Sequence, residues 1–141
     1  MRRPAGYSRR PLAAKLGFKQ GFRISFVHEP NHYVDILGGL PPGTTVLGAR
    51  ATNLDLVHLF ATRQHELDRE FPNAKRRMKP DGTLWVSWPK QSSSLVTDLN
   101  ENIVREIGLA NGLVDVKVAA VDEDWSALKF VYRLKDRAQL R

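Results

Sequence analysis

Short apolar runs of strand length alternate with amphipathic helical patterns along most of the chain. Such alternation is typical of a sheet whose two faces are covered by helices. The predicted strands comprise residues 22–27, 44–49, 54–61, 84–88, 114–121 and 126–134. The predicted helices comprise residues 8–17, 30–37, 62–78 and 97–111. The pattern therefore predicts an α/β protein with a single three-layer, Rossmann-like sheet.

Two connections decide how the predicted strands run. An acidic link, residues 122–125, joins the last two strands as a hairpin, so the final strand runs antiparallel to an otherwise mostly parallel sheet. Only residues 50–53 join the second strand to the third, and four extended residues reach about 14 Å. A parallel crossover takes roughly ten or more residues. Either the second strand is therefore short, or it does not run parallel to its neighbours.

Local signals predict where two helices begin and end. The helix over residues 62–78 is expected to start from a Thr62 cap, and the KPDG sequence of residues 79–82 is typical of a turn after it. The next helix is expected to start with a capping box formed by Asp98 and Glu101.

The excess of positive charge lies at the amino-terminal end of the chain. The 141 residues include 22 Lys+Arg and 15 Asp+Glu, a formal net charge of +7. The first 23 residues hold seven bases and no acid, so the remainder is balanced. We therefore divide the chain into a basic arm with a short helix (1–21), an α/β domain (22–134) and a polar, frayed tail (135–141). Charge confined to one arm excludes a uniformly basic, histone-like surface.

Two groups of bases are candidates for contact with nucleic acid or an acidic protein. One group lies on the arm, and the other closes the third predicted helix. The candidates are Arg2, Arg3, Arg9, Arg10, Lys75, Arg76 and Arg77. The second group has a structural alternative, because cations at the carboxyl end of a helix complement its dipole.

The residue types that are missing or isolated narrow the function classes. The chain contains no cysteine, which excludes disulfides, thiolate nucleophiles and cysteine-bound zinc. His28 and His32 straddle a strand–helix junction, so no metal site is predicted, and His58 is expected to be a satisfied core histidine. No apolar run approaches the roughly 20 residues of a membrane helix, and none follows the basic start as in a signal peptide. We expect a cytoplasmic protein without membrane contact.

From residue 54 to residue 133 the chain holds a strand with Asp55 near its start, a helix, the turn MKPDG, a buried strand, a helix and a closing hairpin. This order resembles the carboxy-terminal half of class I S-adenosylmethionine-dependent methyltransferases. The segments LWVSWPK (84–90), 97–131 and YSRRPLAAKLG (7–17) also resemble a bacterial family known as domain of unknown function 3052. Both resemblances imply a methyltransferase-like fold, and neither implies a reaction.

Two departures from the methyltransferase pattern concern the cofactor. The family places a glycine-rich loop after its first strand, where this chain has HEPNH (28–32). The family also ends its second strand with an acidic residue that holds the ribose hydroxyls. This chain has Arg50 there, and a base cannot accept those hydrogen bonds. The sequence therefore predicts that no cofactor is bound.

The carboxyl ends of the predicted strands carry candidate ligand-binding residues, because ligands of open α/β sheets bind beyond these ends. The candidates are His28, Trp88, Lys90, Asp122 and Trp125. His28 can act as a base or bind an anion, Lys90 can pair with a phosphate or carboxylate, and Asp122 can orient either. The alternatives are structural: core packing for Trp88, a hairpin cap for Trp125 and a solvated turn for Asp122.

Two function hypotheses follow. The first is a non-enzymatic, methyltransferase-like domain that acts through macromolecular contacts of its basic arm. The alternative is a small anionic-ligand-binding protein, or an enzyme, that uses the crevice at the strand ends. A homodimer formed through an edge strand or through Trp88 is a further hypothesis.

Overall fold

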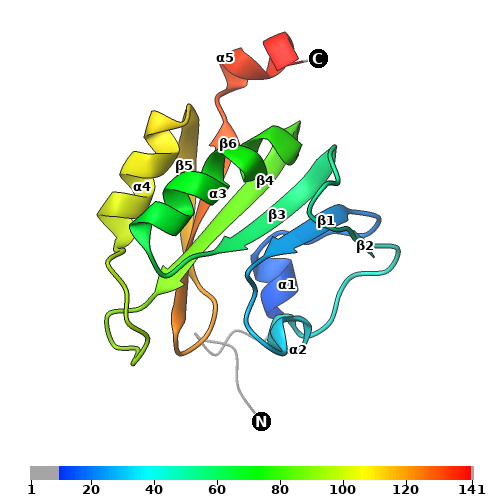
Figure 1. Ribbon diagram of the computed structural model, residues 1–141. Coiled ribbons are helices and arrows are strands. Elements are labelled where there is room, and N and C mark those ends of the chain that lie inside the picture. Colours follow the sequence, from blue (N-terminus) through cyan, green and yellow to red (C-terminus); the bar gives the residue numbers. More distant parts are fainter. Residues whose placement is uncertain (1–9, 141) are drawn as a thin grey trace.

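The computed structural model describes residues 10–140, which form one mixed six-stranded sheet with helices on both faces (Figure 1). Its strand order is β2-β1-β3-β4-β6-β5. The strands are β1 (Arg23–Val27), β2 (Thr45–Val46), β3 (Leu54–Phe60), β4 (Met78–Pro89), β5 (Leu113–Ala120) and β6 (Trp125–Tyr132). The first four strands run parallel, whereas β6 is antiparallel to both β4 and β5. The predicted mostly parallel sheet with a carboxy-terminal hairpin is confirmed.

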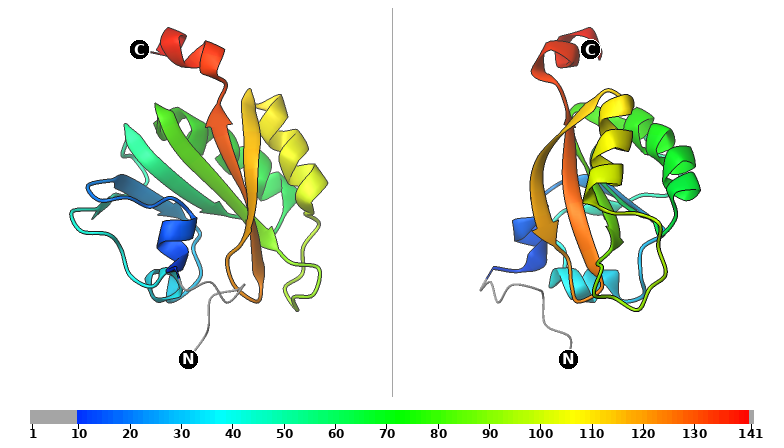
Figure 2. Two further views of the ribbon diagram at one scale, coloured as in Figure 1. Left: turned by 180° about the vertical axis from the view of Figure 1, so that it is seen from behind. Right: turned by 90° about the vertical axis from the view of Figure 1, so that its left-hand side faces the viewer.

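Two longer helices cover one face of the sheet, and two short helices pack on the other (Figure 2). The longer helices are α3 (Gln64–Arg77) and α4 (Glu101–Ala110), and the short ones are α1 (Leu12–Lys15) and α2 (Tyr33–Leu37). Each face has its own apolar core. Trp88 lies in the α3/α4 core and Trp85 in the α1/α2 core, because residues three apart on a strand point to opposite faces of the sheet.

The α1/α2 core includes residues that sequence alone assigns to the arm. Leu12, Leu16 and Phe18 are buried, and the indole N–H of Trp85 donates to the carbonyl of Leu16 at 2.7 Å. Part of the predicted arm therefore belongs to the folded body. Residues 1–9 lie outside the described residues.

The second strand is shorter than predicted, which explains how it connects to the third strand. β2 has two residues and runs parallel to β1, with Arg23 opposite Thr45. Because β2 ends at Val46, the connection to β3 comprises residues 47–53 and is longer than predicted. We call this segment the crossing loop, since it joins strands on opposite sides of β1.

Several predicted helix ends are wrong in detail. Thr62 does not cap α3, whose N-cap is Arg63. Residues 79–82 lie inside β4, as an irregularity between the pairs that Met78 and Thr83 form with β3. The capping box is replaced by Asn100, whose side chain accepts the Ile103 N–H at 2.9 Å.

The carboxy-terminal tail also differs from the prediction. It is not frayed: α5 (Leu134–Arg137) and a 3₁₀ turn (Ala138–Leu140) extend beyond β6 (Figure 1). Across the described range 10–140, no helix combines the length and the apolar character needed to cross a membrane.

Candidate functional site

The strand order reverses at β1, since β2 lies on one side of it and β3 on the other. The crevice beyond the carboxyl ends of β1 and β3 is therefore where a ligand of such a sheet would bind. His28, directly after β1, has a φ of 56°, a backbone region that residues with a side chain seldom adopt. Its Nδ1 lies 3.4 Å from Oε2 of Glu66 on α3. The other oxygen of Glu66 accepts the Thr62 N–H at 3.0 Å, so this contact ties the loops after β1 and β3 together.

A buried polar chain lies beneath this crevice, on the α1/α2 side. The Tyr33 hydroxyl hydrogen bonds with Nδ1 of His58, and Nε2 of His58 lies 2.6 Å from the Ser87 hydroxyl. Burial lowers the pKa of His58 to about 3 and raises the pKa of Tyr33 well above its ordinary value. His58 is thus neutral with both ring nitrogens satisfied, which confirms its interpretation as a core histidine.

Arg77, at the end of α3, holds the crossing loop in place. Its guanidinium donates to the carbonyls of Ala51 and Gly48, at 2.9 and 2.7 Å, and to the Ser25 hydroxyl at 2.7 Å. Only 9% of Arg77 is exposed, and burial lowers its pKa. The predicted contact of Arg77 with an external partner is therefore wrong, because its donors bind backbone and side chain inside the protein.

The other basic residues predicted to contact a partner differ in their exposure and in their partners inside the protein. The Lys75 ammonium donates to the Asn111 carbonyl at the end of α4 and lies 5.7 Å from the centre of the Tyr132 ring, so it has partners inside the protein. Arg76 is exposed and donates to the Asn73 side chain. Arg10 is exposed and donates to the Ala14 carbonyl at 3.1 Å. The predicted contacts of Arg2, Arg3 and Arg9 lie outside the described residues.

An open groove of about 1460 Å³ lies at the carboxyl end of β4, under the loop that leads to α4. Trp88, Lys90, Ser93, Asn100 and Ser126 are among the residues that line it. The loop is anchored to the β5–β6 hairpin through Asp124, whose carbonyl accepts the Lys90 N–H at 2.7 Å and whose carboxylate accepts the Ser93 hydroxyl at 2.9 Å. The loop is anchored to the start of α3 by two further hydrogen bonds (Thr97 Oγ1 to Thr62 O, and Gln64 N to Asp98 Oδ1).

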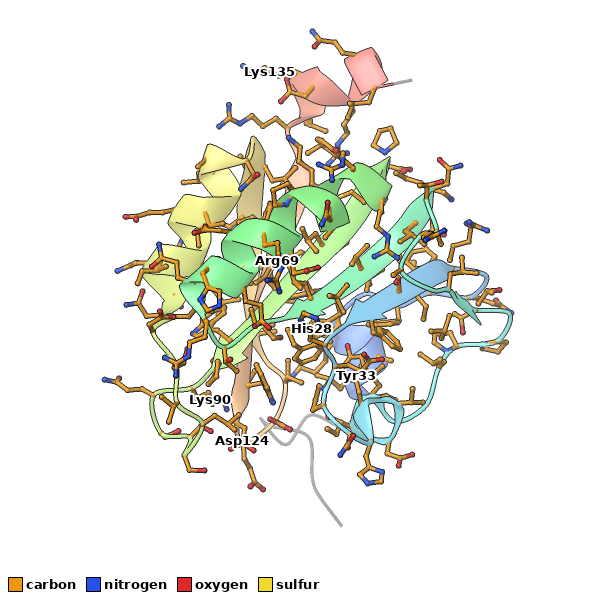
Figure 3. All side chains as sticks on the ribbon, in the orientation of Figure 1. His28, Tyr33, Arg69, Lys90, Asp124 and Lys135 are labelled. Atoms are coloured by element: carbon orange, nitrogen blue, oxygen red, sulfur yellow. The ribbon has the colours of Figure 1, made fainter. Side chains whose placement is uncertain are left out.

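The predicted crevice is only partly assembled. Lys90 and Trp88 line the groove together, but His28, Asp122 and Trp125 do not line it, and Figure 3 shows His28 well apart from Lys90. Asp122 is fully buried, and its Oδ1 accepts the N–H groups of Asp124 and Trp125 at 2.8 and 3.0 Å. The predicted ligand-orienting role of Asp122 is therefore wrong, because this carboxylate shapes the hairpin turn. Trp125 packs edge-on against Phe60, 5.1 Å between ring centres.

Burial also bears on the dimer hypothesis. Trp88 is only 5% exposed, so it does not offer an interface surface. The edge strand β5 does expose Val116 and Val118, and dimerisation through this edge stays a prediction.

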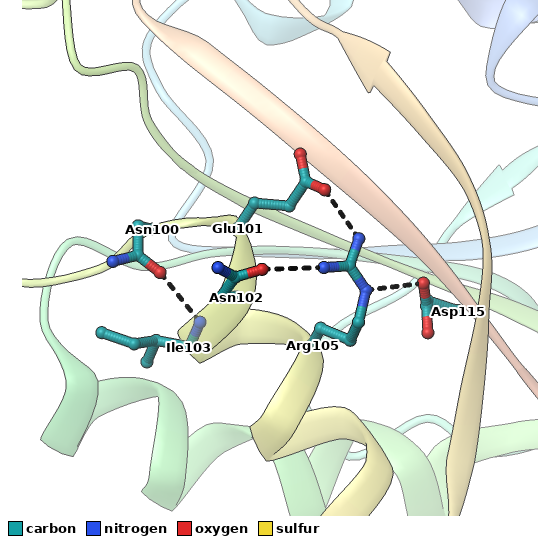
Figure 4. Close-up of polar contacts among 6 residues, drawn as sticks. All are labelled: Asn100, Glu101, Asn102, Ile103, Arg105 and Asp115. Atoms are coloured by element: carbon teal, nitrogen blue, oxygen red, sulfur yellow. Dashed lines mark hydrogen bonds and ion pairs between the residues drawn. The ribbon is translucent and has the colours of Figure 1, made fainter.

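The first turn of α4, beside the groove, is held by an arginine network (Figure 4). Arg105 donates to Glu101 at 2.6 Å, to Asn102 at 3.1 Å and to Asp115 on β5 at 2.9 Å. Hydrogen bonds to the two carboxylates raise the pKa of Arg105. These charged groups are paired with one another, so they position α4 against β5.

Sequence reasoning missed one cluster of charged residues. Lys19 follows α1, Lys117 lies on β5 and Lys129 lies directly opposite Lys117 on β6. Burial, then the nearby charges of Lys117 and Lys19, lowers the pKa of Lys129. We call these three residues the lysine cluster. The hairpin register carried the signal, because opposite residues of an antiparallel pair share one face. Glu66 was also missed, because nothing in its local sequence points to His28.

A metal centre has no structural support in the described part of the chain. Residues 10–140 contain no group of three or more His, Asp or Glu side chains placed to hold an ion.

Comparison with solved structures identifies a methyltransferase-like fold. A SAM-dependent methyltransferase from Aquifex aeolicus matches with a TM-score of 0.57 and 16% identity over 83% of this chain and 85% of that one. Magnesium protoporphyrin IX methyltransferase from Synechocystis PCC 6803 matches with a TM-score of 0.54 and 12% identity, over 86% and 78% of the two chains. A possible exported protein from Bordetella parapertussis has a TM-score of 0.63 and 10% identity, over 85% and 64%.

These identities establish the fold alone. No family model matches the chain, so the resemblance to domain of unknown function 3052 stays a prediction. No curated protein matches it in sequence.

The fold implies S-adenosylmethionine as the group to test, and the residues present do not fit it. After β1, the imidazole of His28 is directed to Glu66 at the point where a cofactor needs open backbone, and Pro30 has no N–H to donate. β2 ends at Val46, and none of the residues 47–50 that follow it carries a carboxylate to accept hydrogen bonds from the ribose hydroxyls. The crossing loop that carries Arg50 has two of its carbonyls occupied by Arg77.

Proposed function

We propose that this chain is a non-enzymatic binding protein on a methyltransferase-like fold, and that its basic amino-terminal arm contacts nucleic acid. The observation that carries the proposal is the contact between His28 and Glu66, which lies at the strand ends where a sheet of this kind binds its ligand. Function depends on the site and not on the fold, so the neighbours' reaction does not transfer to a chain whose site residues differ.

The charge distribution supports a polyanionic partner. All of the net charge of +7 is accounted for by the first 23 residues, which contain no acid. A partner that carries many phosphates gains from such an arm by releasing condensed counterions, which gives association that is sensitive to salt and independent of sequence. An acidic protein is the competing partner, and a competition with an acidic polypeptide separates the two.

The test is fluorescence anisotropy with labelled DNA and RNA oligonucleotides over a range of salt concentrations. The variant Arg2→Gln/Arg3→Gln/Arg9→Gln keeps the chain length and the Arg10–α1 segment while removing three charges. We expect the intact chain to bind, and the variant to lower the slope of log K against log salt by about 2–3, because each arginine that pairs with a phosphate contributes roughly one to this slope.

Either of two outcomes overturns the proposal. One is that the intact chain fails to bind DNA and RNA at 20–50 mM salt. The other is that the triple variant binds with the same affinity and slope as the intact chain. Tighter binding to an acidic protein mimic such as poly-glutamate assigns the arm to the competing partner.

A second candidate function is the binding of a small anionic metabolite in the groove at the end of β4. The observation in its favour is that the Lys90 ammonium lines this groove and has no partner among residues 10–140. A thermal-shift screen with phosphorylated and carboxylated compounds tests it. A true ligand raises the Tm of the wild type and of His28→Ala but not of Lys90→Ala, since His28 lies outside the groove. A screen that stabilises nothing eliminates this candidate.

A further inference from the structure

The groove at the carboxyl end of β4 lies between two walls that the fold holds in place. One wall is the loop of residues 90–99, which hydrogen bonds to the β5–β6 hairpin and to Thr62 fix at both ends. The other wall is the first turn of α4, where Arg105 binds Glu101 and Asn102 (Figure 4). Because both walls are anchored, the groove is formed before a ligand arrives, as is usual for binding sites.

Most of the polar side chains that line the groove are neutral. Those of Gln91, Ser92 and Ser126 have no hydrogen-bond partner within residues 10–140. Asn100 and Asn102 each use the side-chain oxygen inside the protein, at Ile103 and Arg105, which leaves their amide N–H groups available. Hydroxyl and amide groups of this kind match the hydroxyl groups of a ligand, which both donate and accept hydrogen bonds.

The charged side chains of the groove are few and of both signs. Lys90 is the cation that lines it, and its ammonium has no partner in the described part of the chain. Asp98 and Glu101 also line the groove, and each has one carboxylate oxygen bonded inside the protein. A ligand with many anionic groups would be repelled by these two carboxylates, whereas a single anionic group can pair with Lys90. The other carboxylate oxygens can accept hydrogen bonds from the hydroxyl groups of a ligand.

The groove also has an apolar floor and rim. Trp88 and Leu99 line it while remaining only 5% and 6% exposed, whereas Leu95 and Val96 are 40% and 71% exposed. The C–H faces of a sugar ring can lie against such side chains while the ring hydroxyls meet the polar ones. The groove volume of about 1460 Å³ exceeds the roughly 300–1,000 Å³ of most small-molecule pockets, so it has room for more than one ring.

We infer that the groove binds an oligosaccharide that carries a single acidic group, either a phosphate or a carboxylate. This inference rests on the second candidate function above and names the class of its ligand. Lys90 pairs with the acidic group, and the amide, hydroxyl and carboxylate groups of the two walls bind the sugar hydroxyls. A polyanion such as nucleic acid would leave Asp98 and Glu101 facing phosphates, so the groove and the basic arm bind different partners.

The test measures the Tm of the full chain with probes that differ in one feature. Trehalose 6-phosphate and lactobionate each carry one acidic group on a disaccharide. Trehalose is the neutral control, and inorganic phosphate and acetate are anions without a sugar. At about 10 mM probe we expect both acidic disaccharides to raise the Tm by about 3 °C, as for a Kd of about 1 mM. Each of the three controls should raise it by less than about 1 °C.

Two variants test the groove residues, each with a control outside the groove. Lys90→Gln should abolish the Tm shift with both acidic disaccharides, whereas Lys135→Gln, at an exposed residue of α5, should retain it. Gln91→Ala/Ser92→Ala removes two neutral side chains and should weaken binding about fivefold in isothermal titration. The exposed Gln139→Ala should leave this affinity unchanged. Circular dichroism should show all four variants folded.

Failure of this inference differs from failure of the functions proposed above. If phosphate or acetate alone gives the same shift as the disaccharides, the groove recognises an anion without a sugar, and only the second candidate function stands. A Tm shift that persists in Lys90→Gln overturns the inference, as does a larger shift with the acidic tripeptide glutamyl-glycyl-glycine. If neither acidic disaccharide raises the Tm, the inference is also overturned. The oligonucleotide titration of the arm does not involve the groove, so either result can fail alone.

Discussion

The two ends of the sheet use their charged and polar side chains in opposite ways. At the parallel end, His28 contacts Glu66, His58 bonds to two hydroxyls and Arg77 makes three hydrogen bonds inside the protein. At the antiparallel end, Lys117 and Lys129 lie side by side without ion pairs inside residues 10–140. The first end uses these groups to hold the fold together, whereas the second places two like charges side by side.

This difference indicates that the position of a ligand site in a methyltransferase-like fold has to be judged from the side chains present. The parallel end contains the topological switch point, which is where analogy with methyltransferases would place a cofactor. Its side chains instead satisfy one another, and the described residues leave no buried side-chain nitrogen or oxygen without a hydrogen-bond partner. Substitutions at the parallel end should therefore lower stability, and removal of the Lys129 charge at the antiparallel end should not.

Arg77→Met gives the largest expected loss of stability. The variant keeps the apolar stem but removes three hydrogen bonds and leaves the carbonyls of Gly48 and Ala51 poorly satisfied. We expect the free energy of unfolding in urea to fall by about 4 kcal/mol. The exposed neighbour Arg76→Met is the control and should change it by less than about 0.5 kcal/mol. Equal losses of stability for both variants would contradict a structural role for the Arg77 guanidinium.

The pH dependence of stability is the next largest effect. The pKa of His58 is about 3 in the folded state, below its ordinary value of 6.5, so the unfolded chain takes up the proton first. The contribution is complete above pH 6.5 and is lost as the pH falls toward 3, at up to about 1.4 kcal/mol per pH unit. Between pH 6.5 and 4.5 the wild type should lose about 2.3 kcal/mol more than His58→Gln. Parallel pH profiles for the two proteins would contradict a neutral, buried His58.

A smaller loss is expected at the hairpin turn. Asp122→Ala removes the acceptor of two backbone N–H groups and should destabilise the protein by about 2 kcal/mol in urea. Asp122→Asn retains a side-chain oxygen and should recover most of this. If the alanine variant were as stable as wild type but lost ligand binding, Asp122 would regain the role predicted from sequence.

The smallest expected effect on stability is at Lys129, where removal of the charge should not lower the Tm. Lys129→Met keeps the apolar stem that packs on the sheet and removes one charge from the lysine cluster. Its Tm should equal or slightly exceed that of wild type. A clear drop in Tm would mean that the lysine contributes to the fold.

The fold could be predicted to a large extent from local pattern. The alternating strands and helices, the antiparallel hairpin and the opposed tryptophans of β4 are all encoded by short-range periodicity. The start of α3 could not be, because the Gln64 N–H is satisfied by Asp98, 34 residues away. Residues 79–82, where a turn was expected, lie within β4 as an irregularity between the pairs Leu54–Met78 and Leu56–Thr83, so the strand continues on both sides of the predicted turn.

The candidate site was predicted less well, for a physical reason. Residue type shows what a side chain can do, but burial and partners decide what it does. Asp122 and Arg77 have the chemistry of binding residues, and both are used by backbone groups that no sequence pattern reveals. Lys117 and Lys129 are opposite each other in the predicted hairpin, but which residues pair follows from the strand register and not from residue type.

The central claim is that this methyltransferase-like fold has no S-adenosylmethionine site. Isothermal titration of the full chain with S-adenosylmethionine, and separately with S-adenosylhomocysteine, tests it directly. We expect no saturable heat at concentrations up to about 1 mM, roughly the weakest affinity that would suit a cofactor. One-to-one binding of either compound in the micromolar range, abolished in a His28→Trp variant that fills the crevice, would contradict it.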